Sequence, residues 1–495
     1  SSAASDVYKR QAQYETIVKA VREGRLSEED LDRCVRRILE LVVRTPRFKG
    51  YEYSNKPDLK AHAELTRRVA SEGFVLLKND GNTLPLKQTD RVALFGSGSY
   101  KFIAGGRGSG DVNKAYVVAL RDGLISNGFA LNRQLDDRYS KYMERELKRV
   151  DKQNHSRPWY MYEIRPNEMP YPNDFVVEAV EGSDVAILTI GRNSAEAFDR
   201  HIERDFNLHV DEQALLKAVT REFHKAGKKV VVVLNVCGPV EIASWRDSVD
   251  AILVCWQPGQ EGGNSVADVL SGRVSPSGHL PMTFPVSYAD VPSQNFPLNV
   301  PENGTNQSYE NYSKTGKLYD IPNIDYTNYV EDIYIGYRHY ATRNIEVAYP
   351  FGYGLTYTTF SIDDMKVRHK GDRIDVSCRV TNTGDRAAKQ VVQLYSTRVN
   401  PDVDRPAIEL RAYEKTPELA AGESCVVELS ISTDDLAEYS EKETAWKVSK
   451  GDYVLSLGFS SADRPLSGTV TLRKEKLTLV TDAMMPAQGD IFINE

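Results

Sequence analysis

The chain has 495 residues, with 63 lysines and arginines against 70 aspartates and glutamates, so its formal charge is −7. This acidic balance argues against nucleic-acid binding, which needs basic side chains to neutralise phosphates. Apolar runs such as Val230–Leu234 are far shorter than the roughly twenty residues of a membrane span. At about 150 residues per domain, the length predicts a soluble protein of about two to four domains.

Cysteine and histidine are scattered along the chain. The five cysteines form no C-x-x-C pair, and the eight histidines form no H-E-x-x-H motif. We therefore expect no disulfide framework, no metal and no cofactor. Residues 1–12 lack the basic start and apolar centre of a signal peptide, which favours a cytoplasmic location, and they have the character of a scar or a disordered tail.

Two amphipathic helices are predicted after Gln13. The second starts at the capping-box-like Ser27-Glu28-Glu29-Asp30 and ends before Pro46. Each helix is apolar on one side, and no strand in residues 13–61 is available to cover these faces. We interpret this segment as the helical end of a larger unit.

Residues 62–290 alternate strand and helix signals. Short apolar runs typical of buried parallel strands lie at Val92–Phe95, Asp184–Ile190, Lys229–Val236 and Ala251–Trp256. Before the third run, Asp211 is a plausible helix N-cap, and Leu216, Val219 and Phe223 form a helical stripe. The pattern predicts an open α/β/α sandwich with functional loops at the carboxyl ends of its strands.

The remaining chain changes character twice. Residues 291–359 are expected to form a connector and an aromatic junction. Residues 360–475 contain about seven short alternating segments separated by turns, which predicts an immunoglobulin-like β-sandwich. Residues 476–495 are expected to be a C-terminal tail.

Glycine-rich sequence follows the first predicted strand, at Gly96-Ser97-Gly98 and again at Gly105–Asp111. Lys101 stands where a dinucleotide fingerprint needs its third glycine, and no G-K-[S/T] follows, so a nucleotide site is disfavoured. Two interpretations stay open: a plain flexible loop, or a loop that presents Ser109 or Asp111 to a polar ligand.

Two other segments have candidate chemistry. Gly191–Arg200 follows a predicted strand, and its Glu196 is a candidate general acid, although composition alone favours a solvated loop with local ion pairs. The aromatic segment Tyr349–Phe360 has faces that can stack on sugars. A rigid junction that packs the last domain is the favoured interpretation.

Five segments together resemble glycoside hydrolase family three, the family of the bacterial β-glucosidases. They are Glu72–Gly81, Gly105–Asp111, Trp256–Gly263, Gly272–Pro281 and Tyr349–Phe360, and the tail resembles that family's fibronectin-III-like domain. The resemblance implies that Glu196 is the catalytic acid/base and that the hydroxyl of Ser109 reaches the bound sugar. It also implies a nucleophilic aspartate on a β/α barrel that should precede Gln13.

The implied activity is exo-acting, retaining hydrolysis of terminal β-linked sugars, with a β-glucoside or a β-linked oligosaccharide as substrate. Asp6 is rejected as the nucleophile, because Val7 replaces the family's tryptophan and no barrel strands surround it. The chain is therefore expected to be a fragment that is inactive without the missing barrel domain. The alternative is a non-catalytic carbohydrate-binding or scaffolding protein that has lost its barrel, and homo-oligomerisation is left open.

Overall fold

The computed structural model of the chain describes residues 14–106, 110–156, 165–171, 174–193, 200, 202–295, 331–401 and 405–480. The chain divides into two compact units between Glu64 and Leu65. Every helix in the described ranges is too short or too polar to cross a lipid bilayer.

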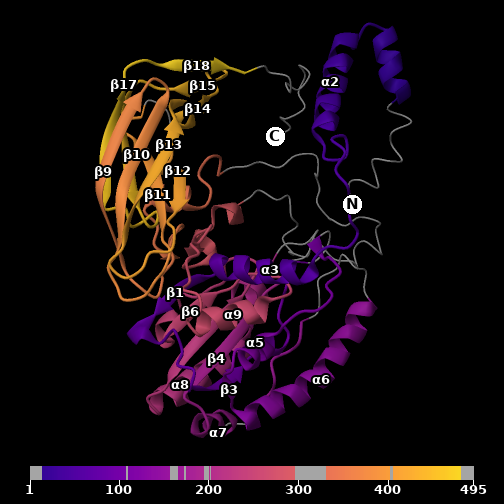
Figure 1. Cartoon of the computed structure of the whole chain (residues 1–495), viewed down its shortest axis with the longest axis vertical. Coiled ribbons are helices and arrows are strands. Elements are labelled where there is room, and N and C mark those ends of the chain that lie inside the picture. The colour runs from indigo at the N-terminus through magenta and orange to yellow at the C-terminus, as the bar shows by residue number, and fades with distance from the viewer. Residues whose placement is uncertain are drawn as a thin grey trace. The chain divides into compact units, whose positions relative to one another are not determined.

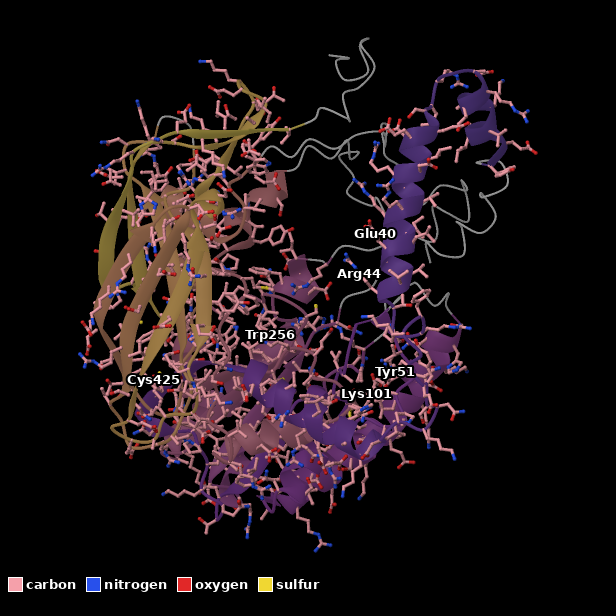
Figure 2. All side chains as sticks on the ribbon, turned by 45° about the horizontal axis from the view of Figure 1, so that its top comes forward. Glu40, Arg44, Tyr51, Lys101, Trp256 and Cys425 are labelled. Carbon is pink, nitrogen blue, oxygen red and sulfur yellow. The ribbon has the colours of Figure 1, made fainter. Side chains whose placement is uncertain are left out.

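The first unit is helical, with one helix over residues 14–22 and a second, α2 (Glu28–Arg44). Ser27 caps α2: its hydroxyl accepts a hydrogen bond from the amide of Asp30 at 3.1 Å. No side chain of α2 is buried, and Figure 2 shows Glu40 and Arg44 along this helix. The exposed apolar side chains of α2 include Val35, Ile38, Leu39, Leu41, Val42 and Val43.

The second unit starts with a six-stranded sheet in the order β1-β6-β5-β4-β2-β3 (Figure 1). Its strands are β1 (Val75–Asn79), β2 (Arg91–Phe95), β3 (Ala130–Leu131), β4 (Val185–Gly191), β5 (Lys229–Asn235) and β6 (Ala251–Val254). The strands β3, β2, β4, β5 and β6 are parallel, whereas the edge strand β1 runs antiparallel to β6. All four predicted strands are confirmed, with ends that differ by one or two residues.

Helices cover both faces of this sheet, because alternate residues of each strand point to opposite sides. In β5, Val230 and Val232 belong to one apolar cluster, and Val231 and Val233 belong to the other. The first cluster includes side chains of α6 (Arg133–His155), α7 (Phe175–Glu181) and α8 (Val210–Lys225). The second includes side chains of α5 (Leu120–Ser126) and α9 (Gly262–Leu270), and Ala70 of α3 (Leu59–Gly73) packs against it. The predicted α/β/α sandwich is confirmed.

Helix α8 starts earlier than its sequence suggests. Its N-cap is His209: the imidazole accepts from the amide of Asp211 at 3.5 Å, and the carboxylate of Glu212 accepts from the amide of His209 at 2.8 Å. The prediction of Asp211 as N-cap is therefore wrong, because a histidine here takes the role that small oxygen-bearing side chains usually have. The predicted stripe of Leu216, Val219 and Phe223 is buried.

An antiparallel β-sandwich follows, as predicted. One sheet has the order β13-β10-β9, the other has the order β12-β11-β16-β17, and a smaller sheet has the order β14-β15-β18. The bounds are β9 (Phe360–Lys370), β10 (Arg373–Asn382), β11 (Val391–Arg398), β12 (Glu409–Lys415), β13 (Ser424–Ser432), β14 (Glu438–Ser440), β15 (Ala445–Val448), β16 (Gly451–Gly458), β17 (Leu466–Leu472) and β18 (Lys476–Leu479). Alternate residues of β10, Ile374, Val376, Cys378 and Val380, enter the core between the two larger sheets.

Buried polar contacts join the sandwich to the preceding α/β part. The amide of Gln393 donates to the carbonyl oxygens of Gly352 at 2.9 Å and Phe459 at 2.7 Å, and its oxygen accepts from the hydroxyl of Tyr395 at 2.6 Å. The hydroxyl of Tyr357 donates to the carbonyl of Val269 at 2.9 Å. The aromatic segment that contains Gly352 and Tyr357 thus contacts both parts of the second unit.

Candidate active site

The loops at the carboxyl ends of β2, β4, β5 and β6 lie at one edge of the parallel sheet, where α/β proteins usually build their sites. The predicted residues Ser109 and Glu196 belong to the loops after β2 and β4. Both lie outside the described residues, within 107–109 and 194–199. The residues on either side of these segments are described, and they define how each loop is attached.

The loop after β4 starts at a buried ion pair. Arg192 is 1% exposed, and its guanidinium donates to the two carboxylate oxygens of Glu212 at 2.7 and 2.6 Å. It also donates to the carbonyls of Gly191 at 2.7 Å and Asn207 at 3.3 Å. Burial by itself would raise the pKa of Glu212, but the charge and hydrogen bonds of Arg192 hold that pKa below its usual value. The start of the loop is therefore fixed by charge-assisted bonds.

A second arginine joins the two ends of the same loop. Arg165 donates to the carbonyl of Gly191 at 2.7 Å and to the buried carboxylate of Asp205 at 3.0 Å. Arg200 in turn donates to the carbonyl of Asp205 at 2.6 Å. The residues before and after 194–199 are thus attached to one another through Arg165.

The loop after β4 also contacts the loop after β6. The amide of Gln257 donates to the side-chain oxygen of Asn193 at 3.0 Å. Next to it lies Trp256, which is labelled in Figure 2. Trp256 has a positive φ of 51°, and its indole donates to the carbonyl of Gly73 at 3.2 Å. The left-handed backbone at Trp256 turns the chain sharply at the point where it meets Asn193.

The loop after β2 is held by the same neighbours. Asn235, the last residue of β5, accepts from the amide of Ile103 at 2.7 Å and donates to the carbonyl of Ile103 at 3.0 Å. The amide of Gly259 donates to the carbonyl of Ala104 at 2.8 Å. The chain that enters residues 107–109 is therefore attached to the ends of β5 and β6.

The chain after residues 107–109 is attached to the same loop after β6 as the chain before them. The amide of Val118 donates to the carbonyl of Gln260 at 2.8 Å, and the hydroxyl of Tyr116 donates to the carboxylate of Glu261. Together with Gly259, these contacts attach both flanks of the Ser109 loop to the start of α9. The described flanks of the two predicted site residues therefore meet at one edge of the sheet.

Two amides of the Gly96-Ser97-Gly98 turn are bonded within the chain and are not available to a phosphate. The amide of Ser97 donates to the carboxylate of Glu168 at 2.9 Å, and the amide of Gly96 donates to the hydroxyl of Tyr139 at 3.2 Å. Burial raises the pKa of Glu168 above its usual value. Gly96 has a φ of 88°, and a Cβ there would come within 2.5 Å of the carbonyl of Thr189. The glycine serves close packing on β4, with a carboxylate of the same chain in the position of an anion.

Three residues at this edge, Arg165, Asn235 and Gln257, are not predicted as site residues from the sequence, although Asn235 and Gln257 lie within the segments Lys229–Val236 and Trp256–Gly263. Asn235 had a usable signal, because it is a polar residue at the end of the apolar strand sequence KVVVVLN. Arg165 lies in irregular chain, and no sequence pattern marks it.

Among the described residues, no group of three or more His, Cys, Asp or Glu side chains is arranged to hold a metal ion.

The chain has the architecture of a multidomain protein in which an α/β sandwich precedes a fibronectin-like β-sandwich. Its candidate site is formed by the loops at the carboxyl ends of the parallel strands. Within this class of multidomain proteins, the chain belongs to glycosyl hydrolase family 3. The model of the glycosyl hydrolase family 3 C-terminal domain matches residues 74–357, and that of the fibronectin type III-like domain matches residues 390–461.

Known relatives agree with this assignment. The chain is 33% identical to Beta-glucosidase A of Butyrivibrio fibrisolvens, covering 83% of this chain and 51% of that protein. It is 31% identical to the Exo-alpha-(1->6)-L-arabinopyranosidase of Bifidobacterium longum, over 90% of this chain and 53% of that protein. The structure of beta-glucosidase 3B from Thermotoga neapolitana in complex with glucose aligns with a TM-score of 0.81 at 41% identity, covering 94% of this chain and 62% of that one. The chain thus spans about half the length of the curated relatives that it matches.

Proposed function

We propose that this chain is part of a retaining, exo-acting β-glycosidase, most specifically a β-glucosidase, in which Glu196 is the acid/base and Ser109 binds the sugar. In this proposal the nucleophilic carboxylate and its barrel domain belong to polypeptide outside these 495 residues. Support comes from the family and from relatives that carry β-glucosidase names.

One observation in the structure supports the proposal most. The flanks of the Glu196 loop and of the Ser109 loop attach to the same short stretch after β6: Asn193 to Gln257 at 3.0 Å, and Ala104 to Gly259 at 2.8 Å. Loops anchored this close together are suited to present a proton donor and a hydroxyl to one sugar ring.

The pairing of two arginines at this edge also suits an acid catalyst. A general acid must keep its proton near the working pH, which an uncompensated positive charge beside it would oppose. Arg192 pairs with Glu212 at 2.6 Å, and Arg165 pairs with Asp205 at 3.0 Å. These two arginines are therefore each neutralised by a carboxylate, whereas Arg200 donates to the backbone carbonyl of Asp205 at 2.6 Å.

The proposed reaction has two steps. The nucleophilic carboxylate attacks the anomeric carbon while Glu196 gives its proton to the departing glycosidic oxygen. Glu196 then takes a proton from the water that breaks the glycosyl-enzyme bond, which releases the sugar with its configuration retained. Retention requires the two carboxyl groups to lie about 5–5.5 Å apart.

The test uses the chain joined at Gln13 to the β/α barrel of a family 3 relative, here called the barrel-fused chain. Glu196→Gln should lower kcat/KM for phenyl β-glucoside by about 100- to 10,000-fold, because a poor leaving group needs a proton. The loss should be far smaller for dinitrophenyl β-glucoside, whose leaving group departs unprotonated. The unfused chain is the baseline and should show no normal turnover of either substrate.

The matched control is Glu203→Gln, which makes the same change at an exposed carboxylate close by in sequence. It should leave both rates unaltered. An unchanged rate for phenyl β-glucoside in Glu196→Gln would show that the acid/base assignment is wrong. Sugar binding without hydrolysis by the barrel-fused chain would instead favour a non-catalytic carbohydrate-binding protein.

A further inference from the structure

Asn235 is a buried amide at the end of an apolar strand. It closes β5, it is 0% exposed, and the five residues before it are all buried and apolar. Burying an amide side chain is unfavourable unless its donors and acceptor are all bonded. The contacts of Asn235 therefore indicate what this residue does at the end of the strand.

Its side chain bonds to two loops at once. The oxygen accepts from the amide of Ile103 at 2.7 Å, and the nitrogen donates to the carbonyls of Ile103 at 3.0 Å and Trp256 at 2.6 Å. The backbone carbonyl of Asn235 accepts from the amide of Arg192 at 2.9 Å. One residue thus contacts the loops that follow β2, β4 and β6.

We propose that Asn235 is a positioning residue that sets the relative placement of the loops containing Ser109 and Glu196. It holds the first loop directly at Ile103. It acts on the second through its own backbone carbonyl and through Trp256, whose neighbour Gln257 bonds to Asn193 at 3.0 Å. This inference rests on the proposed function, since it assigns the geometry of that same site.

The chemistry of the position requires an amide. Asparagine supplies two donors and an acceptor within one planar group, and all three groups facing it are backbone atoms that cannot turn away. Aspartate would keep the bond from the amide of Ile103, but its negative charge would be repelled by the carbonyl oxygens of Ile103 and Trp256. Leucine has the same number and branching of side-chain heavy atoms but forms no hydrogen bonds, so it would leave an amide and two carbonyls unbonded.

Asn382 provides a matched control in the β-sandwich. It is also 0% exposed, its nitrogen donates to the carbonyls of Arg386 at 2.7 Å and Leu419 at 2.8 Å, and its oxygen accepts from Thr358 at 2.7 Å. The oxygen of Asn382 also accepts from the amide of Gly384 at 3.1 Å, so Asn382→Leu removes four side-chain bonds and Asn235→Leu removes three. Only Asn235 lies at the candidate site.

The first measurement is amide hydrogen exchange on the chain itself. In Asn235→Leu, the amide of Ile103 should exchange about tenfold faster or more, the equivalent of one lost hydrogen bond. The amide of Arg192 should change less, because the backbone carbonyl of residue 235 to which it bonds is kept. Asn382→Leu should leave both amides at their original rates. Unchanged exchange at Ile103 in Asn235→Leu would overturn the proposal.

The second measurement compares leaving groups in the barrel-fused chain. Asn235→Leu should lower kcat/KM for phenyl β-glucoside by about 100-fold, the cost of a misplaced catalytic group, and should affect dinitrophenyl β-glucoside less. Asn382→Leu should leave the ratio of the two rates unchanged. If Asn235→Leu does not fold, Asn235→Asp replaces it with the same expected ratio.

The two proposals fail in distinguishable ways. If Glu196→Gln does not alter the rates, the proposed function fails whatever the Asn235 variants do. If Glu196→Gln shows the expected leaving-group dependence but Asn235→Leu behaves like Asn382→Leu, the proposed function stands and the positioning role of Asn235 is overturned.

Discussion

The guanidinium of Arg192 is almost completely removed from water, and Glu212 is the carboxylate with which it pairs. Glu212→Ala should lower the free energy of unfolding by about 3–5 kcal/mol, because it leaves a buried charge uncompensated. Urea denaturation measures this loss. Glu178→Ala, which breaks the exposed pair with Arg138, is the control and should cost less than about 1 kcal/mol. Equal losses in the two variants would contradict the importance of the buried pair.

The same pair predicts a pH dependence. The pKa of Glu212 is lowered in the folded chain, so its contribution to stability is complete above the unfolded-state pKa of about 4.3 and is lost as the pH falls further. The stability difference between wild type and Glu212→Gln should therefore be constant near neutrality and shrink on acidification. A difference that grows on acidification would contradict the lowered pKa.

At the level of single residues, sequence reasoning finds what local pattern encodes. Ser27 is found as a helix cap because its partner, Asp30, lies three residues along the chain. The role of Arg165 cannot be found in this way, since its partners Gly191 and Asp205 are distant in sequence and come together only in the folded sheet. The placements of Ser109 and Glu196 stay predictions that depend on the family resemblance.

Among the elements, helices α5 and α9 cross at two glycines. A Cβ on Gly123 would lie 2.1 Å from the carbonyl oxygen of Gly263, and one on Gly263 would lie 2.0 Å from that of Ala119. Gly123→Ala should therefore destabilise the chain by about 3 kcal/mol, the upper end of the usual cost of overpacking, because backbone cannot rotate aside. Thermal or urea unfolding measures the effect.

Gly110→Ala is the control for this crossing. A Cβ at Gly110 has no neighbour within 4 Å, so the substitution should change the free energy of unfolding by less than about 1 kcal/mol. If Gly123→Ala were as harmless as Gly110→Ala, the close approach of α5 and α9 would be wrong.

Four parallel strands, β2, β4, β5 and β6, are predictable from sequence because burial on both faces demands uninterrupted apolar runs, as in β5. The parallel strand β3 has two residues, neither of them buried, and is missed. The edge strand β1 is not predicted as a strand. It follows α3 after a single residue, and its antiparallel pairing with β6 depends on a partner about 175 residues away in the chain. Helix α6 is missed because most of its surface is polar, although Leu135, Tyr139, Met143 and Val150 form a buried stripe.

Within the second unit, Gln393 is a buried side chain that bonds the sandwich to the aromatic segment before it. It joins Gly352, Phe459 and Tyr395, and it is 3% exposed. Gln393→Leu should lower the free energy of unfolding by about 2–3 kcal/mol, because it leaves two carbonyls and a hydroxyl unbonded. In calorimetry the α/β part and the sandwich should then unfold in separate steps.

Thr220→Val is the control for coupling between these parts. Thr220 is also buried, but its hydroxyl bonds within α8, to Leu216 at 2.9 Å. This variant should lower the melting temperature without separating the transitions. A single transition in both variants would mean that Gln393 stabilises the sandwich without coupling it to the α/β part.

The clamp formed by Arg165 has a consequence for how such a protein changes over evolution. Gly191 and Asp205 are joined by Arg165, a residue outside the loop, and Arg192 at the start of the loop is fixed separately by Glu212. Closure entropy also rises only slowly with loop length. A stable variant should therefore keep Arg165, Arg192 and Asp205, whereas insertions between Asn193 and Arg200 should cost the scaffold little stability.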